Sequence, residues 1–201
     1  MTSIWKSYAS GLALWTLWCW LMVWRPEPFA NATLRAGVRI AVVLLPALWL
    51  ARKHELSFGL WPINWRAVGI GLAVAVVLLG GNIGLIRPKT LTIPHGFNTY
   101  FNFIIGSPIA EELLFRGAIM QLVRKYTRPL TAMLISTLLF VMFHWPQWLI
   151  LEPLPLNQFL VLSANIFFIG MVLATLYQRS NSLLAPIIYH ILNNFVAFLI
   201  G

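Results

Sequence analysis

Seven apolar runs occupy most of this chain, and they leave little room for any fold other than a bundle of membrane helices. They lie at about residues 10–24, 37–51, 67–86, 98–123, 129–151, 157–178 and 183–200. A helix needs about 20 apolar residues to cross a bilayer, and roughly 17–25 is the usual range. The first two runs are shorter than that, and the other five are long enough. We therefore predict an all-α, polytopic membrane bundle with about seven transmembrane helices, within a range of six to eight.

The charged residues support the same class. Charged residues make up 9% of the 201 residues, against roughly 25% in a soluble domain. The net charge of +9 raises nucleic-acid binding as an alternative. The basic residues, however, stand between the apolar runs, where the flanks of membrane helices carry them. We expect the lipid bilayer as a partner and no nucleic acid. The single cysteine, Cys19, leaves no disulfide framework and no cysteine metal cluster.

The loop charges also predict an orientation. If every run crosses the bilayer, eight basic residues fall on the side of the N-terminus and four on the other side. The eight are Lys6, Arg52, Lys53, Arg66, Arg124, Lys125, Arg128 and Arg179, and the four are Arg25, Arg35, Arg87 and Lys89. Because cytoplasmic loops carry the excess of Lys and Arg, the bias predicts a cytoplasmic N-terminus.

Two of the five acidic residues, Glu111 and Glu112, are adjacent in the fourth apolar run. A charged side chain at the bilayer centre costs about 3 kcal/mol or more, so such a pair needs partners and usually has a function. Arg116 follows Glu112 by four residues, in the order that favours an ion pair on one helix face. A purely structural ion pair would account for Glu112. It would not account for Glu111, which we expect to face a cavity.

The fourth run also contains a helix-start signal. Ser107 is a suitable N-cap, and Pro108 suits the first helical position. We therefore predict a helix from this point to about Lys125, preceded by a separate short or re-entrant segment over residues 98–105. Glu111 and Glu112 would then lie just after the first turn. The positive end of the helix dipole would favour an ionised carboxylate there.

Two histidines match Glu111 in predicted depth. Measured from the basic helix ends at 1.5 Å per residue, Glu111 lies about 20 Å in, His144 about 24 Å and His190 about 17 Å. The three therefore fall in one layer near the middle of a core about 30 Å thick. Asn194 shares a helix face with His190, and Phe140 is placed to wall His144. Pro146 is expected to kink or end the helix beside His144.

One carboxylate, two imidazoles and an amide suit hydrolysis. Glu111 could take a proton from water as a general base. His144, His190 or the Asn194 amide could stabilise an oxyanion. No serine or cysteine has an obvious base at matched spacing, which favours direct attack by water. A zinc ion on Glu111, His144 and His190 is the alternative, since two histidines and a glutamate form a catalytic zinc set. There is no H-E-x-x-H sequence, and we prefer a mechanism without a metal.

Three motifs in order resemble the CPBP (Abi) family of intramembrane proteases, which includes the type II CAAX prenyl endopeptidases. They are E-E-x-x-x-R at residues 111–116, F-x-x-x-H at 140–144 and H-x-x-x-N at 190–194. The resemblance covers about residues 105–198. It implies peptide-bond hydrolysis near the membrane, with Glu111 activating water and with His144, His190 and Asn194 as its catalytic partners. Glu112 and Arg116 would be mainly structural.

We therefore expect a single membrane domain, with helices lacking a recognised motif over residues 1–96 and a catalytic core over 97–201. The expected function is a glutamate-type endopeptidase acting on a membrane-associated protein or peptide, at a C-terminal or transmembrane segment. The compact chain indicates a prokaryotic inner membrane protein. Because prokaryotes generally lack protein prenylation, this disfavours a prenylated substrate. Two alternatives stay open: a non-catalytic binding or immunity protein on the same fold, and a proton-coupled transporter that uses buried Glu and His.

Overall fold

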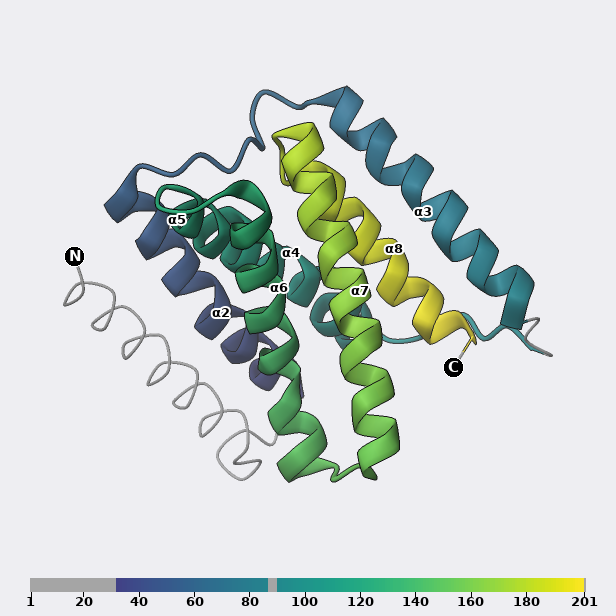
Figure 1. Cartoon of the computed structure of the whole chain (residues 1–201). Coiled ribbons are helices and arrows are strands. Elements are labelled where there is room, and N and C mark those ends of the chain that lie inside the picture. The colour runs from purple at the N-terminus through teal and green to yellow at the C-terminus, as the bar shows by residue number, and fades with distance from the viewer. Residues whose placement is uncertain (1–31, 87–89, 201) are drawn as a thin grey trace.

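The structure is a computed structural model that describes residues 32–86 and 90–200, and every regular element in those ranges is a helix (Figure 1). Three segments, η1 to η3, have the wider π-helical geometry. The elements are α2 (Ala32–His54), α3 (Trp65–Ile86), η1 (Thr99–Gly106), α4 (Ser107–Glu112), η2 (Leu113–Met120), α5 (Gln121–Arg124), α6 (Pro129–Pro146), η3 (Gln147–Leu151), α7 (Leu156–Ser180) and α8 (Leu184–Ile200). The all-α prediction is thus confirmed for the described residues. The first apolar run, 10–24, lies outside them.

The surface of the helices is unusually apolar. Val76 on α3 is 73% exposed, Val161 on α7 is 69% exposed and Phe168 is 58% exposed. Large exposed apolar areas mark contact with a membrane or a partner. Two stretches are long and apolar enough to span a bilayer by length and composition, Pro129–Ile150 and Leu156–Ser180. The predicted count of about seven spans stays a prediction.

The fourth apolar run forms one continuous helical path from Thr99 to Arg124 rather than two segments. The predicted N-cap at Ser107 is wrong, because Ser107 is itself helical and its N–H donates to the Asn102 carbonyl, five residues back. Gly106 permits this path where α2 crosses: a Cβ there would collide with the Phe101 carbonyl and the Ile40 side chain. Glu111 therefore lies mid-helix, and the prediction that it sits at the positive end of a helix dipole is also wrong.

Pro146 marks a change in helix type. The regular α-helical geometry of α6 ends at Pro146, and one π-helical segment, η3, continues to Leu151. Proline removes a backbone donor and its ring clashes with the preceding turn, so the wider geometry begins where α-helical bonding fails.

The basic helix ends gather at one end of the bundle, at the top of Figure 1 for α3 and α7. Lys125 Nζ donates to the His54 carbonyl at 3.0 Å, which joins the ends of α5 and α2. Arg124 donates to Gln178 Oε1 at 3.0 Å, which joins α5 to α7. These contacts hold the ends of α2, α5 and α7 together at one end of the bundle.

Candidate active site

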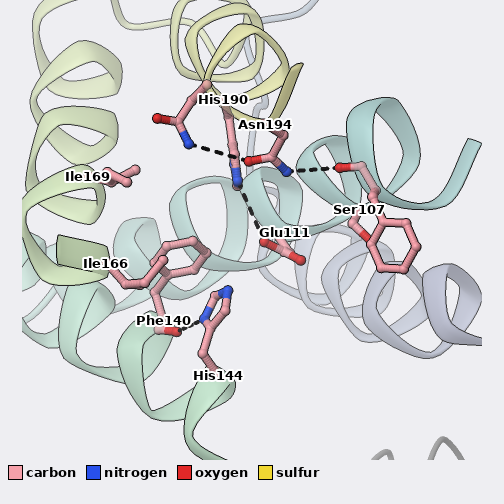
Figure 2. Close-up of a pocket in the computed structure, with 10 residues that line it drawn as sticks. Ser107, Glu111, Phe140, His144, Ile166, Ile169, His190 and Asn194 are labelled. Carbon is pink, nitrogen blue, oxygen red and sulfur yellow. Dashed lines mark hydrogen bonds and ion pairs between the residues drawn. The ribbon is translucent and has the colours of Figure 1, made fainter. Parts of the chain in front are cut away.

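A cavity of about 180 Å³ lies between α4, α6, α7, α8 and η1 (Figure 2). Four of its lining residues are those expected to be catalytic: Glu111, His144, His190 and Asn194. Phe140, expected to wall His144, lines it as well. The full lining is Phe103, Ser107, Glu111, Phe140, His144, Ile166, Ile169, His190, Asn193 and Asn194.

Glu111 and His190 face each other across this cavity, although α4 and α8 lie far apart in the sequence. Each residue is 5% exposed. Glu111 Oε2 is 3.9 Å from His190 Nε2. That distance is too long for a direct hydrogen bond, and it is short enough for one water molecule to contact both atoms.

The backbone fixes the His144 ring. The Phe140 carbonyl, one helical turn earlier, lies 2.8 Å from His144 Nδ1. Since a carbonyl only accepts hydrogen bonds, Nδ1 must carry the proton in this contact. The other ring nitrogen, Nε2, points toward the cavity (Figure 2). The Phe140 ring packs edge-on against both imidazoles, with centroids 4.9 Å from His144 and 5.9 Å from His190.

Asn194 is held by the backbone of η1. Its Nδ2 donates to the Phe103 carbonyl at 2.9 Å. Asn193 Nδ2 donates to Asn194 Oδ1 at 3.4 Å. An amide nitrogen has two protons, so Asn194 can bind Phe103 with one and retain the other for a ligand in the cavity.

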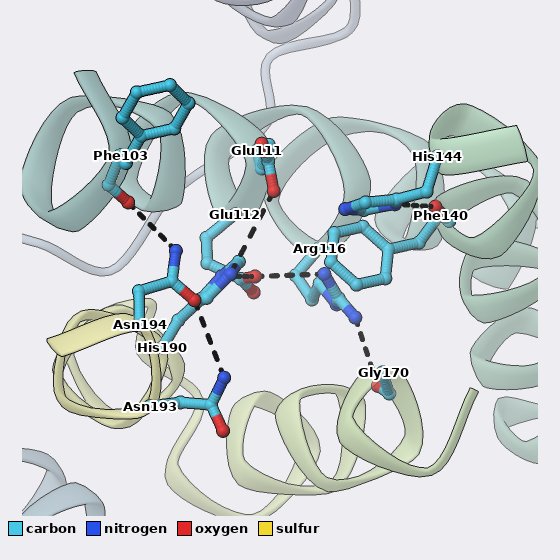
Figure 3. A network of polar contacts seen from close by, with 10 residues as sticks. All are labelled: Phe103, Glu111, Glu112, Arg116, Phe140, His144, Gly170, His190, Asn193 and Asn194. Carbon is cyan, nitrogen blue, oxygen red and sulfur yellow. Dashed lines mark hydrogen bonds and ion pairs between the residues drawn. The ribbon is translucent and has the colours of Figure 1, made fainter. Parts of the chain in front are cut away.

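Beneath the cavity, Glu112 and Arg116 form a fully buried ion pair (Figure 3). Arg116 Nη1 donates to Glu112 Oε1 at 2.9 Å, and Nη2 donates to the Gly170 carbonyl at 3.0 Å. The guanidinium also lies over the Phe140 ring, 4.4 Å from its centroid. The ion pair expected from the four-residue spacing is therefore present, and it also ties η2 to α7.

Sequence reasoning missed one contact of this pair. His190 Nδ1 lies 2.9 Å from Glu112 Oε1, the same oxygen that accepts from Arg116. It also missed two polar cavity residues, Ser107 and Asn193. Ser107 could have been found, because it precedes Glu111 by four residues and so shares its helix face. Asn193 carried no comparable signal.

The donor atoms around the cavity suit zinc, which binds His nitrogen and Glu oxygen. As placed, however, no three His, Cys, Asp or Glu side chains among the described residues form a group that could hold a metal ion. Glu111, His144 and His190 would have to move together to do so. The zinc alternative therefore requires a rearrangement of this site.

Gly170 lets α7 close over the buried arginine, and we predict that Gly170→Ala destabilises the protein. A Cβ there would lie 2.8 Å from Thr137 Cγ2 and 3.4 Å from Arg116 Nη2. Overpacking of this kind costs about 1–3 kcal/mol. Thermal unfolding in detergent measures the effect. Gly69→Ala on α3 is the matched control, because a Cβ at Gly69 would meet nothing within 4 Å; equal midpoints for the two variants would contradict the prediction.

Comparison with known proteins agrees with the motifs. The family model for "Type II CAAX prenyl endopeptidase Rce1-like" matches residues 94–196. An Escherichia coli protein described as an uncharacterized 24.3 kDa protein is 31% identical in an alignment of 151 positions that covers 70% of this chain. The match spans 63% of that relative's length. No solved structure matches the chain at a significant level.

Proposed function

Because the chain belongs to the Rce1-like family of type II CAAX prenyl endopeptidases, we propose that it is an intramembrane endopeptidase that cleaves a membrane-associated protein or peptide. The observation that carries this proposal is the convergence of Glu111, His144, His190 and Asn194 on one small cavity. The proposed setting is a bundle of about seven transmembrane helices in a prokaryotic inner membrane.

In the proposed reaction, Glu111 is the general base. It takes a proton from a water molecule held between its carboxylate and the imidazoles, and the water oxygen attacks the peptide carbonyl carbon. The carbonyl π electrons move to oxygen and create an oxyanion. When the tetrahedral intermediate collapses, the C–N bond breaks and the proton on Glu111 passes to the leaving amine. Atoms and charge balance without a covalent enzyme intermediate.

The orientations of the two imidazole rings indicate which groups orient the water and which group stabilises the oxyanion. A neutral His144 with its proton on Nδ1 offers only a lone pair at Nε2, so it can accept a hydrogen bond from the water and orient it. The Asn194 amide keeps a proton for the oxyanion, and a donor of this kind contributes about 10²–10³ in rate. His190 can donate from Nε2 only when its ring is protonated.

The cavity also limits the substrate. A cavity of about 180 Å³ is far too small for a folded domain, so only a short piece of extended chain could enter it. Its walls combine the apolar side chains of Ile166, Ile169 and Phe103 with the polar set. We propose an unwound C-terminal or transmembrane segment as substrate.

Reconstitution tests the proposal against its alternatives. The purified chain in liposomes is supplied with a library of apolar peptides, and mass spectrometry follows the products. New peptide termini support the endopeptidase. Proton-driven uptake without cleavage would instead indicate a transporter, and binding without either would indicate a non-catalytic protein.

A chelator tests the metal question. We expect 1,10-phenanthroline to leave cleavage within about twofold, because Glu111 supplies the base and Asn194 the oxyanion donor. The control is the same treatment followed by added zinc. Loss of cleavage with chelator and recovery with zinc would establish a zinc mechanism on Glu111, His144 and His190.

A further inference from the structure

We propose that Glu112 is a positioning residue for His190, in addition to being the partner of Arg116. It holds the proton of His190 on Nδ1 and thereby turns Nε2 toward Glu111. As a contribution to catalysis, this inference rests on the proposed function. As a statement about the histidine ring, it stands independently.

The geometry of the ion pair argues for this second role. A carboxylate that serves only an arginine pairs best in a two-bond fork, with both oxygens occupied. Here both short contacts, from Arg116 Nη1 and from His190 Nδ1, converge on Oε1 at 2.9 Å. Among the described residues, Glu112 Oε2 and Arg116 Nε are buried without a hydrogen-bond partner. Glu112 and Arg116 therefore form one hydrogen bond instead of two, and Glu112 Oε1 also contacts His190.

The surroundings keep the shared oxygen in place. Glu112 and Arg116 are both 0% exposed. Arg116 is fixed at its other end by the Gly170 carbonyl and by the Phe140 ring. Phe140 in turn directs His144 through its carbonyl. Arg116 therefore contacts both residues that orient the imidazoles: Glu112, which contacts His190, and Phe140, which contacts His144 (Figure 3).

The proton position decides what His190 can do. A carboxylate accepts and does not donate, so the contact with Glu112 assigns the proton to Nδ1. Nε2 is then the atom 3.9 Å from Glu111. If the proton moved to Nε2, that atom could no longer accept a hydrogen bond from a water molecule shared with Glu111. Carboxylates that fix a histidine in this way at metal sites are worth about 10- to 100-fold in activity, and we expect a similar effect of Glu112.

Two double variants separate positioning from ion pairing, because both remove the ion pair without leaving an unpaired buried charge. Glu112→Gln with Arg116→Met keeps an oxygen acceptor for His190 Nδ1. Glu112→Leu with Arg116→Met removes it. Replacing a buried ion pair by neutral side chains of similar volume is often neutral or stabilising, so both are expected to fold.

The readout is nitrogen-15 NMR of histidine-labelled full-length chain in detergent. The chain has four histidines, His54, His95, His144 and His190, and single His→Gln variants assign their signals. We expect His190 to be protonated at Nδ1 in the native chain and in the Gln-containing variant, and to exchange between tautomers in the Leu-containing variant. Cleavage by the Leu-containing variant should be about 10- to 100-fold slower than by the Gln-containing one.

These results test the role of Glu112 separately from the proposed endopeptidase activity. An unprotonated Nδ1 in the native chain overturns the inference before any variant is made. The same Nδ1 signal in both double variants also overturns it. The native chain could show no cleavage at all, while the His190 tautomer still differs between the two double variants as expected. In that case the positioning role of Glu112 stands and the endopeptidase proposal fails.

Discussion

Glu111→Gln should lose at least 100-fold in peptide cleavage while the folded protein is kept. The amide preserves the size of the side chain and cannot accept the proton of the attacking water, and general-base catalysis contributes about 10²–10⁴ in rate. Glu111 Oε2 lies 3.9 Å from His190 Nε2, and the buried ion pair with Arg116 is made by Glu112. The loss should therefore appear in turnover and not in stability.

The measurement is the rate of product formation from the apolar peptide library by purified protein in liposomes. Glu152→Gln is the control, because Glu152 is exposed just beyond η3 and does not line the cavity. A Glu111→Gln variant that cleaves at the native rate would remove Glu111 from the mechanism.

Arg116→Met should have the largest effect on stability. The substitution leaves Glu112 as a fully buried carboxylate without its cation. Breaking a buried pair from one side costs about 3–5 kcal/mol. For a chain of this size, the unfolding midpoint should fall by roughly 6–20 °C.

Two controls accompany that measurement. Arg124→Met removes an exposed arginine whose guanidinium donates to the exposed end of Gln178, and it should change the unfolding free energy by less than about 0.5 kcal/mol. Adding Glu112→Gln to Arg116→Met should restore most of the lost stability, since no unpaired charge remains. If Arg116→Met unfolds at the native midpoint, the buried pair is not stabilising the fold.

The sequence predicted the helical class and most helix positions, because the apolar runs are long and their ends are charged. Residues 157–178 were expected to be helical and lie in α7, and residues 183–200 correspond to α8. The depth estimate also placed Glu111, His144 and His190 in one layer, and the structure brings them to one cavity. Rise per residue is a local property, so relative positions along neighbouring helices can be estimated from sequence.

The errors arose where packing overrides local signals. Ser107 and Pro108 indicated a helix start, but α2 crosses at Gly106, and the π-helical segment η1 continues directly into α4 without a break. π-helical segments are rare and often lie at functional sites. The contact from His190 to Glu112 joins residues 78 positions apart. This contact depends on how α4 and α8 are each rotated about their own axes. A sequence run that is apolar on all sides does not specify that rotation.

The most direct test of the central claim is mass spectrometry of protein termini in membranes from cells that express either the native chain or Glu111→Gln at matched levels. We predict new termini within or beside apolar segments of membrane proteins, present with the native chain and absent with the variant. Identical sets of termini from the two, with both proteins folded and abundant, would contradict an endopeptidase that depends on Glu111.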